Sequence, residues 1–162
     1  MVWRIIRATE PRNTRVPLLF TALAQFIGEH LNRYETTPAP KLATAVEIGA
    51  YGECVAAAFV RRHGYRVLTR NYKTARGEID LVCRHRDVLV FVEVRSRADE
   101  MFGRPAETID AAKEDALRHA ARRYLDLLGR DGGEILYRFD AVEVRLKAGD
   151  IPACTLLPNY FV

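Results

Sequence analysis

The sequence predicts an α/β fold in which two helices flank a mixed central sheet, in the order helix, three strands, helix, strand. Apolar residues recur at helical spacing within residues 45–63 and again within 110–128. Three short extended runs, rich in β-branched and aromatic residues, lie between these segments, and a fourth run follows at 135–146. This αβββαβ alternation is typical of a layered α/β domain.

Length and cysteine content set the broad class of protein. A chain of 162 residues fits one domain with a short appendage and can bury roughly two thirds of its unfolded surface. Cys54, Cys83 and Cys154 are widely spaced and form no C-x-x-C pair. The pattern favours a reducing compartment, and therefore a cytoplasmic protein, and a fold that needs no structural zinc.

Residues 1–44 are predicted to be an N-terminal helical extension of a main domain at 45–162. The apolar stretch at 16–27 is shorter than the roughly 20 residues that cross a membrane, so we expect no membrane association. Within 18–34, apolar residues instead repeat at helical spacing: Leu19, Leu23, Phe26, Ile27, Leu31 and Tyr34. We expect an amphipathic helix that docks on the main domain or on a partner, followed by a proline-containing linker at 35–44.

The first helix of the main domain, at 45–63, has clear end signals. Thr44 and Glu47 match the T-x-x-E capping box, and Gly64 supplies a left-handed stop. Gly49 and Gly52 interrupt the apolar pattern and favour close approach to another backbone. The predicted apolar line of this helix consists of Val46, Ala50, Ala57 and Val60.

The predicted strands after this helix are 65–72, 78–83 and 88–95, and their short connections fit a meander. The second helix, at 110–128, carries acidic residues in its first turn, where the positive helix end favours them. Its expected inward face is Ala112, Ala116, Ala120, Tyr124 and Leu128. Glycines follow this helix, and 135–146 is the last predicted strand.

Two acidic residues stand in the apolar hairpin "GEIDLVCRHRDVLVFVEVRSR". A turn centred between Arg86 and Asp87 places Asp80 opposite Glu93, and the alternation of side chains puts Arg95 on the same face as Glu93. Directly opposed like charges destabilise a sheet and call for a compensating cation. Arg95 could supply that cation alone, and a bound divalent ion could do so as well.

Carboxylate oxygens on facing strands suit Mg²⁺ or Mn²⁺, which take one or two protein carboxylates together with water and phosphate oxygens. Such an ion polarises a phosphodiester and activates water. The hairpin therefore indicates either a metal site or an ion-paired strip on the protein surface, and the spacing leaves both interpretations open.

The basic residues of the chain are clustered although its net charge is only +4. The residues that we single out as nucleic-acid contacts are Arg70, Asn71, Lys73, Arg76 and Arg97, all of which lie in or around the predicted hairpin. Local clustering of this kind favours a polyanionic partner, most simply nucleic acid, and a solvated basic face explains the composition equally well.

Several segments in order, "RNYKTARGEIDLV", "VLVFVEVRSR", "FGRPAETIDAAKEDAL" and "YRFDAVEV", resemble the YraN-like proteins of bacteria. That family is regarded as predicted endonucleases of the PD-(D/E)xK, restriction-endonuclease-like superfamily, related to Holliday junction resolvases. The resemblance covers roughly residues 46–146 and implies the αβββαβ core of that superfamily, together with a Mg²⁺-dependent site that cleaves phosphodiesters.

The resemblance also implies roles for individual residues. Glu53 matches the acidic residue of the first helix, Asp80 the aspartate of the second strand, and Glu93, Val94 and Arg95 the E-x-K motif, with Asp80, Glu93 and the Val94 carbonyl as metal ligands. Arg95 stands where the superfamily has lysine; arginine keeps the charge but cannot act as a base. Lys113 matches a lysine typical of the family and could lend its amine to the site, although an ordinary exposed helix lysine explains it equally well.

Three functions remain open at this point. The first is a metal-dependent endonuclease that acts on branched or structured DNA, for which a symmetric homodimer is plausible because two strands of one junction must be cut. The second is a catalytically inactive nucleic-acid-binding module of the same fold, in which Arg95 neutralises the carboxylates. The third is an interaction scaffold that docks through the helix at 18–34.

Overall fold

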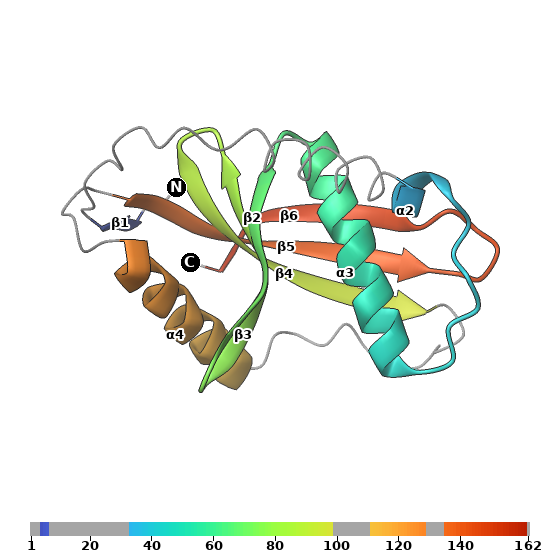
Figure 1. The fold of residues 1–162 in the computed structure, drawn as a ribbon, viewed down its shortest axis with the longest axis horizontal. Helices are drawn as coiled ribbons and strands as arrows, with labels where there is room; N and C mark the ends of the chain where they lie inside the picture. The colour runs from blue at the N-terminus through green and yellow to red at the C-terminus, as the bar shows by residue number, and fades with distance from the viewer. Residues whose placement is uncertain (1–3, 7–32, 99–110, 129–134, 162) are drawn as a thin grey trace, which may run out of the picture.

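The computed structural model describes residues 4–6, 33–98, 111–128 and 135–161, and it has the predicted α/β fold (Figure 1). Every predicted element of the main domain is present in the predicted order, with bounds that differ by a few residues at most. The elements are β1 (Arg4–Ile6), α2 (Arg33–Thr36), α3 (Ala45–Arg62), β2 (Arg66–Thr74), β3 (Gly77–His85), β4 (Val88–Ala98), α4 (Ala111–Leu128), β5 (Ile135–Leu146) and β6 (Ala153–Phe161).

The sheet is mixed, as predicted. Strands β2, β3 and β4 form an antiparallel meander, whereas β5 returns through α4 to pair in parallel with β4. Strand β6, which the sequence reading missed, pairs antiparallel with β5, and the short β1 pairs with the beginning of β5. The order β1-β5-β4-β3-β2 makes β4 and β5 the centre of the described sheet.

Helix α3 begins and ends where its signals predict. The Thr44 side chain accepts the Glu47 amide, the Glu47 carboxylate accepts the Thr44 amide, and Gly64 follows the helix with φ +83°. The predicted apolar line is wrong in its first half, because Val46 is 80% exposed and Ala50 is exposed too. Burial starts from Ile48, because the sheet meets another side of the helix.

The inward face of α4 is also corrected by the structure. Ala112 and Leu128 are exposed, whereas the middle of the predicted stripe, Ala120 with the half-buried Ala116 and Tyr124, does face the sheet. The buried residues of α4 are Leu117, Ala120, Ala121 and Leu125. A stripe of every fourth residue drifts around a helix of 3.6 residues per turn, so its two ends leave the contact.

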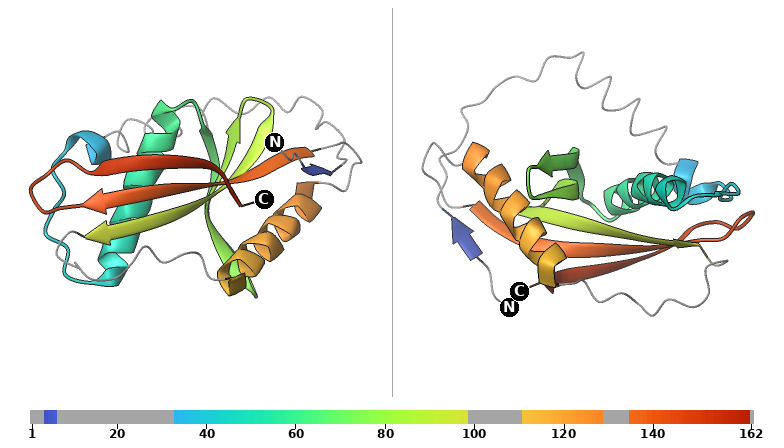
Figure 2. Two further views of the ribbon diagram at one scale, coloured as in Figure 1. Left: turned by 180° about the vertical axis from the view of Figure 1, so that it is seen from behind. Right: turned by 90° about the horizontal axis from the view of Figure 1, so that it is seen from below.

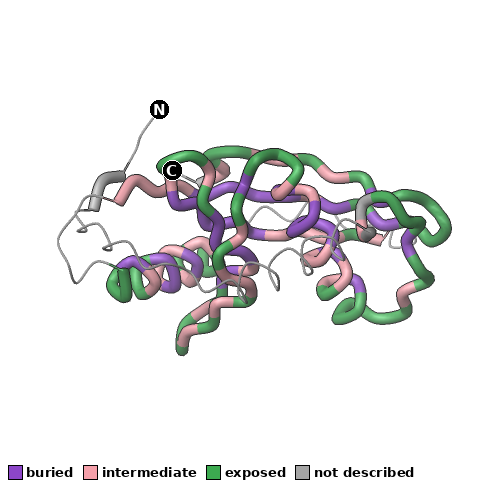
Figure 3. The backbone as a smooth tube through the Cα atoms, turned by 45° about the horizontal axis from the view of Figure 1, so that its top comes forward, coloured by how far each residue is buried: buried purple, intermediate pink, exposed green. Residues whose placement is uncertain are grey.

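The two long helices cover opposite faces of the sheet. Alternate residues of β4 point to different cores: Val90 and Val92 pack with α3, whereas Leu89 and Phe91 pack with α4. In the view from behind, β4, β5 and β6 lie in front of α3, and α4 lies beside β3 at the other end (Figure 2). The buried residues, purple in Figure 3, are concentrated along the middle of the molecule. The predicted acidic residues lie inside the two strands between these helices, Asp80 in β3 and Glu93 in β4.

Most of the predicted helix at 18–34 lies outside the described residues. Its last residue, Tyr34, belongs to α2 and packs edge-on against Tyr51 at 5.4 Å between ring centroids. In the segment predicted as a linker, Ala39 forms a bridge with Ala148 and is 3% exposed, so this part of the segment packs on the main domain. The described helices include none that is long and apolar enough to span a membrane.

Candidate functional site

The candidate site lies in the fork where β3 and β4 separate. Ladder pairing between the two strands runs from His85 opposite Val88 to Leu81 opposite Val92, which confirms the predicted turn and makes Asp80 and Glu93 the next facing pair. Instead of a further ladder bond, the backbone amide of Val94 donates to Oδ2 of Asp80 at 2.7 Å. The Asp80 carboxylate is therefore held between the two strands.

Glu93 is the buried acid of the site, since only 3% of its surface is exposed. It shares the face of Leu89 and Phe91, which is covered by α4, and Lys113 in the first turn of α4 forms an ion pair with its Oε1. Apart from this ion pair, Oε1 has no hydrogen-bond partner among the described residues. The buried carboxylate thus has a counter-charge but spare capacity to accept another ligand.

Asp80 is strongly affected by its surroundings. Burial raises the pKa of its carboxyl from the ordinary value of 3.8 to about 7, and the negative charges of Glu93 and Glu53 act in the same direction. The Val94 amide and the Lys113 ammonium oppose this rise in pKa. Acids with perturbed pKa values of this kind cluster at functional sites.

Glu53 reaches the site from α3, on the other face of the sheet. The approach depends on Gly52, because a Cβ at that position would lie 2.6 Å from Cβ of Ser96 on β4, closer than side chains tolerate. The predicted close backbone approach is therefore confirmed at Gly52 but not at Gly49, where a Cβ would meet nothing within 4 Å. Close packing at Gly52 brings the neighbouring Glu53 within electrostatic range of Asp80.

Arg95 does not pair with either acid of the hairpin. Its Nη1 donates to the hydroxyl of Tyr160 on β6 at 2.9 Å, and its guanidinium carbon lies 5.6 Å from the centroid of the Tyr160 ring. The cation beside Glu93 is Lys113 instead. Lys113 therefore supplies the counter-charge of Glu93, and Arg95 is held by Tyr160 instead.

The predicted nucleic-acid contacts occupy two places. Arg70, Asn71 and Lys73 lie on the edge strand β2 and Arg76 in the turn that follows, whereas Arg97 is exposed on β4. Two of the five contact other side chains: Nη2 of Arg70 lies 3.3 Å from Sγ of Cys54, and Lys73 pairs with Glu78 at 3.3 Å.

Asn71 is closer to the acids than its sequence position indicates. The flanking pairs, Arg70 with Leu81 and Tyr72 with Ile79, place Asn71 opposite Asp80. Its φ of +50° is uncommon for a residue other than glycine, and such backbone strain concentrates at functional sites. Asn71, Asp80 and Glu93 therefore form one row across β2, β3 and β4.

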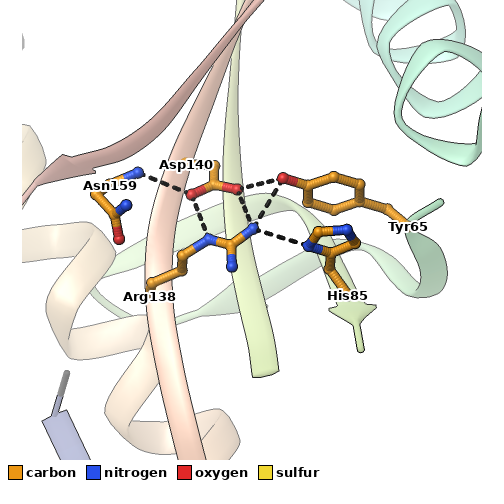
Figure 4. A network of polar contacts seen from close by, with 5 residues as sticks. All are labelled: Tyr65, His85, Arg138, Asp140 and Asn159. Carbon is orange, nitrogen blue, oxygen red and sulfur yellow. Dashed lines mark hydrogen bonds and ion pairs between the residues drawn. The ribbon is translucent and has the colours of Figure 1, made fainter. Parts of the chain in front are cut away.

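A second polar cluster lies on the α3 face, and Asp140 is its fully buried centre (Figure 4). The guanidinium of Arg138 donates to both carboxylate oxygens at 2.8 and 3.0 Å, and the Tyr65 hydroxyl donates to Oδ2 at 2.9 Å. The backbone amide of Asn159 on β6 donates to Oδ1 at 3.0 Å. Asp140 therefore joins β5 to β6, which fits a structural role.

The residues present fit a Mg²⁺ or Mn²⁺ ion held by few protein ligands. No group of three or more His, Cys, Asp or Glu side chains suited to a metal occurs within 4–6, 33–98, 111–128 and 135–161. Two carboxylates on facing strands nevertheless match the preference of Mg²⁺, which keeps waters and substrate phosphates as its other ligands. Lys113 already pairs with Glu93 Oε1, so a bound ion would share or replace that counter-charge.

Fold and site together define an α/β protein with a pair of carboxylates in the fork of a central hairpin. The model of the uncharacterised protein family UPF0102 matches residues 52–144, which include Glu53, both hairpin acids, Arg95 and Lys113. The chain belongs to this family.

Curated relatives agree with this assignment. A UPF0102 protein of Anaeromyxobacter dehalogenans is 46% identical over 103 residues, which are 64% of this chain and 75% of the relative. A UPF0102 protein of Symbiobacterium thermophilum is 40% identical over 114 residues, or 70% of this chain and 95% of the relative. One of Moorella thermoacetica is 44% identical over 98 residues, or 60% and 80%.

Proposed function

We propose that the protein is a metal-dependent endonuclease that acts on DNA, with branched or otherwise structured DNA as its substrate class. The observation that carries this proposal is the facing pair of Asp80 and Glu93, with Glu53 and Lys113 beside it. Two neighbouring carboxylates repel each other, and a divalent cation between them would relieve that repulsion. The fold and the similarity to YraN-like sequences support the same reaction class.

The carboxylates of Asp80 and Glu93, with the Val94 carbonyl, would hold Mg²⁺ or Mn²⁺. When bound, such an ion polarises a phosphodiester and lowers the pKa of an attacking water. Glu53, which approaches Asp80 from α3, would orient the water or the outer shell of the ion. Asp80 must be ionised to serve as a ligand, so its raised pKa makes metal binding tighter as the pH rises through about 7.

Arg95 and Lys113 would stabilise negative charge on the phosphate. An arginine side chain does not serve as a base, so Arg95 would act by charge and hydrogen bonding. Lys113 lies at the surface end of its ion pair, where 55% of its side chain is exposed and can reach a phosphate oxygen. Arg70, Asn71, Lys73, Arg76 and Arg97 would contact other backbone phosphates and position the DNA.

A second candidate function is a nucleic-acid-binding module without turnover. The ion pair between Lys113 and Glu93 favours it, because an ammonium next to a buried carboxylate supplies the compensating charge that a metal would otherwise provide. In that protein the basic residues would bind DNA and the hairpin acids would be structural. The two functions differ in whether Asp80 and Glu93 bind a divalent ion.

A cleavage assay with Mn²⁺ on single-stranded, duplex, flap and four-way DNA tests the proposal. We expect the wild type to cut at least one of these substrates and Glu93→Gln to lose at least 100-fold in rate, as on removal of an essential charge. Glu78→Gln is the matched control, because Glu78 is exposed on the same strand as Asp80 and pairs with Lys73. It should cut like the wild type.

Titration calorimetry with Mn²⁺ separates the two functions. The endonuclease should bind the ion, and Asp80→Asn and Glu93→Gln should abolish binding. DNA binding without any uptake of Mn²⁺ would instead support the inactive module. In the same series Arg95→Lys restores the lysine of the superfamily motif; faster cleavage by this variant would identify the wild type as a restrained nuclease.

A further inference from the structure

Arg95 is connected to the C-terminal strand of the sheet. The contact with Tyr160 joins β4 to β6, although β5 lies between these two strands, so the long arginine side chain crosses β5. One nitrogen, Nη1, donates to the tyrosine hydroxyl at 2.9 Å, and the guanidinium also lies 5.6 Å from the ring centroid. Two separate contacts therefore restrict the orientation of one cation.

The position of Tyr160 is itself fixed by the buried network of Figure 4. The register between β5 and β6 shifts between Phe139 and Ala141, and Asn159, the residue before Tyr160, has φ +53°. The amide of Asn159 is held by Oδ1 of Asp140 at 3.0 Å, and Asp140 is held in turn by Arg138. The register shift, held by the fully buried carboxylate of Asp140, thus fixes the position of Tyr160 on β6.

The guanidinium of Arg95 keeps its charge available. Within the described residues no carboxylate forms a salt bridge with it, whereas Lys113 is paired with Glu93. The hydroxyl of Tyr160 orients the guanidinium by a hydrogen bond and not by a salt bridge. An oriented arginine that forms no salt bridge among the described residues, two residues from Glu93 and on the same face of β4, is suited to a phosphate oxygen at the carboxylate pair.

We propose that Tyr160 is a positioning residue that holds Arg95 for a phosphodiester oxygen of the DNA. This inference rests on the proposed function and deepens it, because it assigns part of the site to β6, which follows the residues matched by the family model. An arginine side chain has several rotatable bonds, and contact with a phosphate restricts them. A hydrogen bond that already holds the side chain reduces the entropy lost when the phosphate binds.

A double-mutant cycle tests this proposal on the full chain. The four proteins are the wild type, Tyr160→Phe, Arg95→Met and the double variant. Affinity for fluorescein-labelled four-way and duplex DNA is measured by anisotropy with Ca²⁺, and single-turnover cleavage with Mn²⁺. We expect Tyr160→Phe to weaken binding or slow cleavage about 3- to 10-fold when Arg95 is present, and less than about 2-fold when Arg95 is methionine.

Tyr137→Phe is the matched control, because Tyr137 is a half-buried tyrosine of the neighbouring strand β5 that packs in the α4 core. It should change neither binding nor cleavage. Urea unfolding of every variant identifies losses that come from instability. Equal effects of Tyr160→Phe with and without Arg95, in an active wild type, would overturn the positioning role alone. A wild type that neither binds nor cuts any DNA would overturn the proposed function and the positioning role together.

Discussion

Lys113 on α4 forms its ion pair with Glu93 on β4, and the two partners differ sharply in exposure: 55% for the lysine side chain and 3% for the glutamate. The sequence offered both Arg95 and Lys113 as cations for the site, and packing of α4 on the sheet brings Lys113 to Glu93. The charge balance of the candidate site therefore depends on a contact between two elements that are distant in sequence.

Replacement of Lys113 by methionine should leave the Glu93 charge buried without a partner. Loss of a partner to a buried polar group costs about 1–3 kcal/mol, and more where the group is charged, so Lys113→Met should lower the free energy of unfolding by at least that amount in buffer with EDTA. Mn²⁺ should restore most of the loss, since the ion would occupy the same carboxylate. Urea unfolding with EDTA and with Mn²⁺ measures both effects.

Lys73→Met serves as the control for that prediction, because the Lys73–Glu78 pair is exposed on both sides. Exposed pairs contribute about 0–1 kcal/mol, and Mn²⁺ should make no difference to this variant. Equal losses in the Lys73 and Lys113 variants would contradict the view that Glu93 needs a counter-charge.

The raised pKa of Asp80 predicts a specific dependence of stability on pH. The pKa of Asp80 is about 7 in the folded protein and near 3.8 in the unfolded chain. The folded state therefore binds more protons than the unfolded state at pH values between these two. The stabilisation from this group is complete below pH 3.8 and is lost as the pH rises through about 7, with a slope of at most about 1.4 kcal/mol per pH unit.

Asp80→Asn should remove this slope, because asparagine can still accept the hydrogen bond from Val94 but does not titrate. Urea unfolding of both proteins at several pH values between 5 and 8, without metal, measures the difference between them. Asp87→Asn, in the exposed hairpin turn, is the control and should follow the wild type. A difference between wild type and Asp80→Asn that is constant with pH would refute the raised pKa.

Two glycines of α3 should respond in opposite ways to alanine. At Gly52 the new Cβ would lie 2.6 Å from Cβ of Ser96, and overpacking of this kind costs about 1–3 kcal/mol. At Gly49 a Cβ would meet nothing within 4 Å. Gly49→Ala should therefore stabilise the helix by about 0.5–1 kcal/mol.

Thermal and urea unfolding of the two alanine variants check this pair of predictions. A second variant tests the cause: Ser96→Gly removes the opposing Cβ and should recover part of the loss in Gly52→Ala. If both alanine variants shift stability in the same direction, the close approach of α3 to β4 does not determine the effect of a side chain at Gly52.

The buried network predicts a large effect at Arg138. Asp140 has no exposed surface, so Arg138→Met would leave its charge with only a hydroxyl and an amide as partners. Breaking a buried ion pair from one side costs about 3–5 kcal/mol. Urea unfolding should show a loss of that order, whereas Arg145→Met, an exposed arginine on the same strand, should change stability little. A small loss at Arg138 would mean that solvent reaches Asp140.

Some features of the site were predictable because they depend on local spacing. The hairpin turn at Arg86 and Asp87 fixes which residues face one another, so the register of Asp80 and Glu93 follows from counting along two strands. The caps of α3 were readable for the same reason, since Thr44 and Glu47 act within one helical turn. Predictions of which side of each helix is buried were less successful, because Val46 and Leu128 are apolar yet face solvent.

Strand β6 was missed because its sequence contains two features that normally end a strand. Pro158 cannot donate a ladder hydrogen bond, and Asn159 adopts a left-handed conformation. The strand continues because Asp140 accepts the Asn159 amide within a register shift, which a reading of residues 153–161 alone does not reveal.

The sequence by itself determined the order of helices and strands and the pairing of two acids on one hairpin, because periodicity and turn position act over a few residues. The tertiary structure decided which side chains meet at the site. Lys113 reaches Glu93 because α4 packs on one face of the sheet, Glu53 approaches Asp80 because Gly52 lets α3 close on the other, and Arg95 reaches Tyr160 across β5. These contacts join elements far apart in sequence, so only their packing against a common sheet could define them.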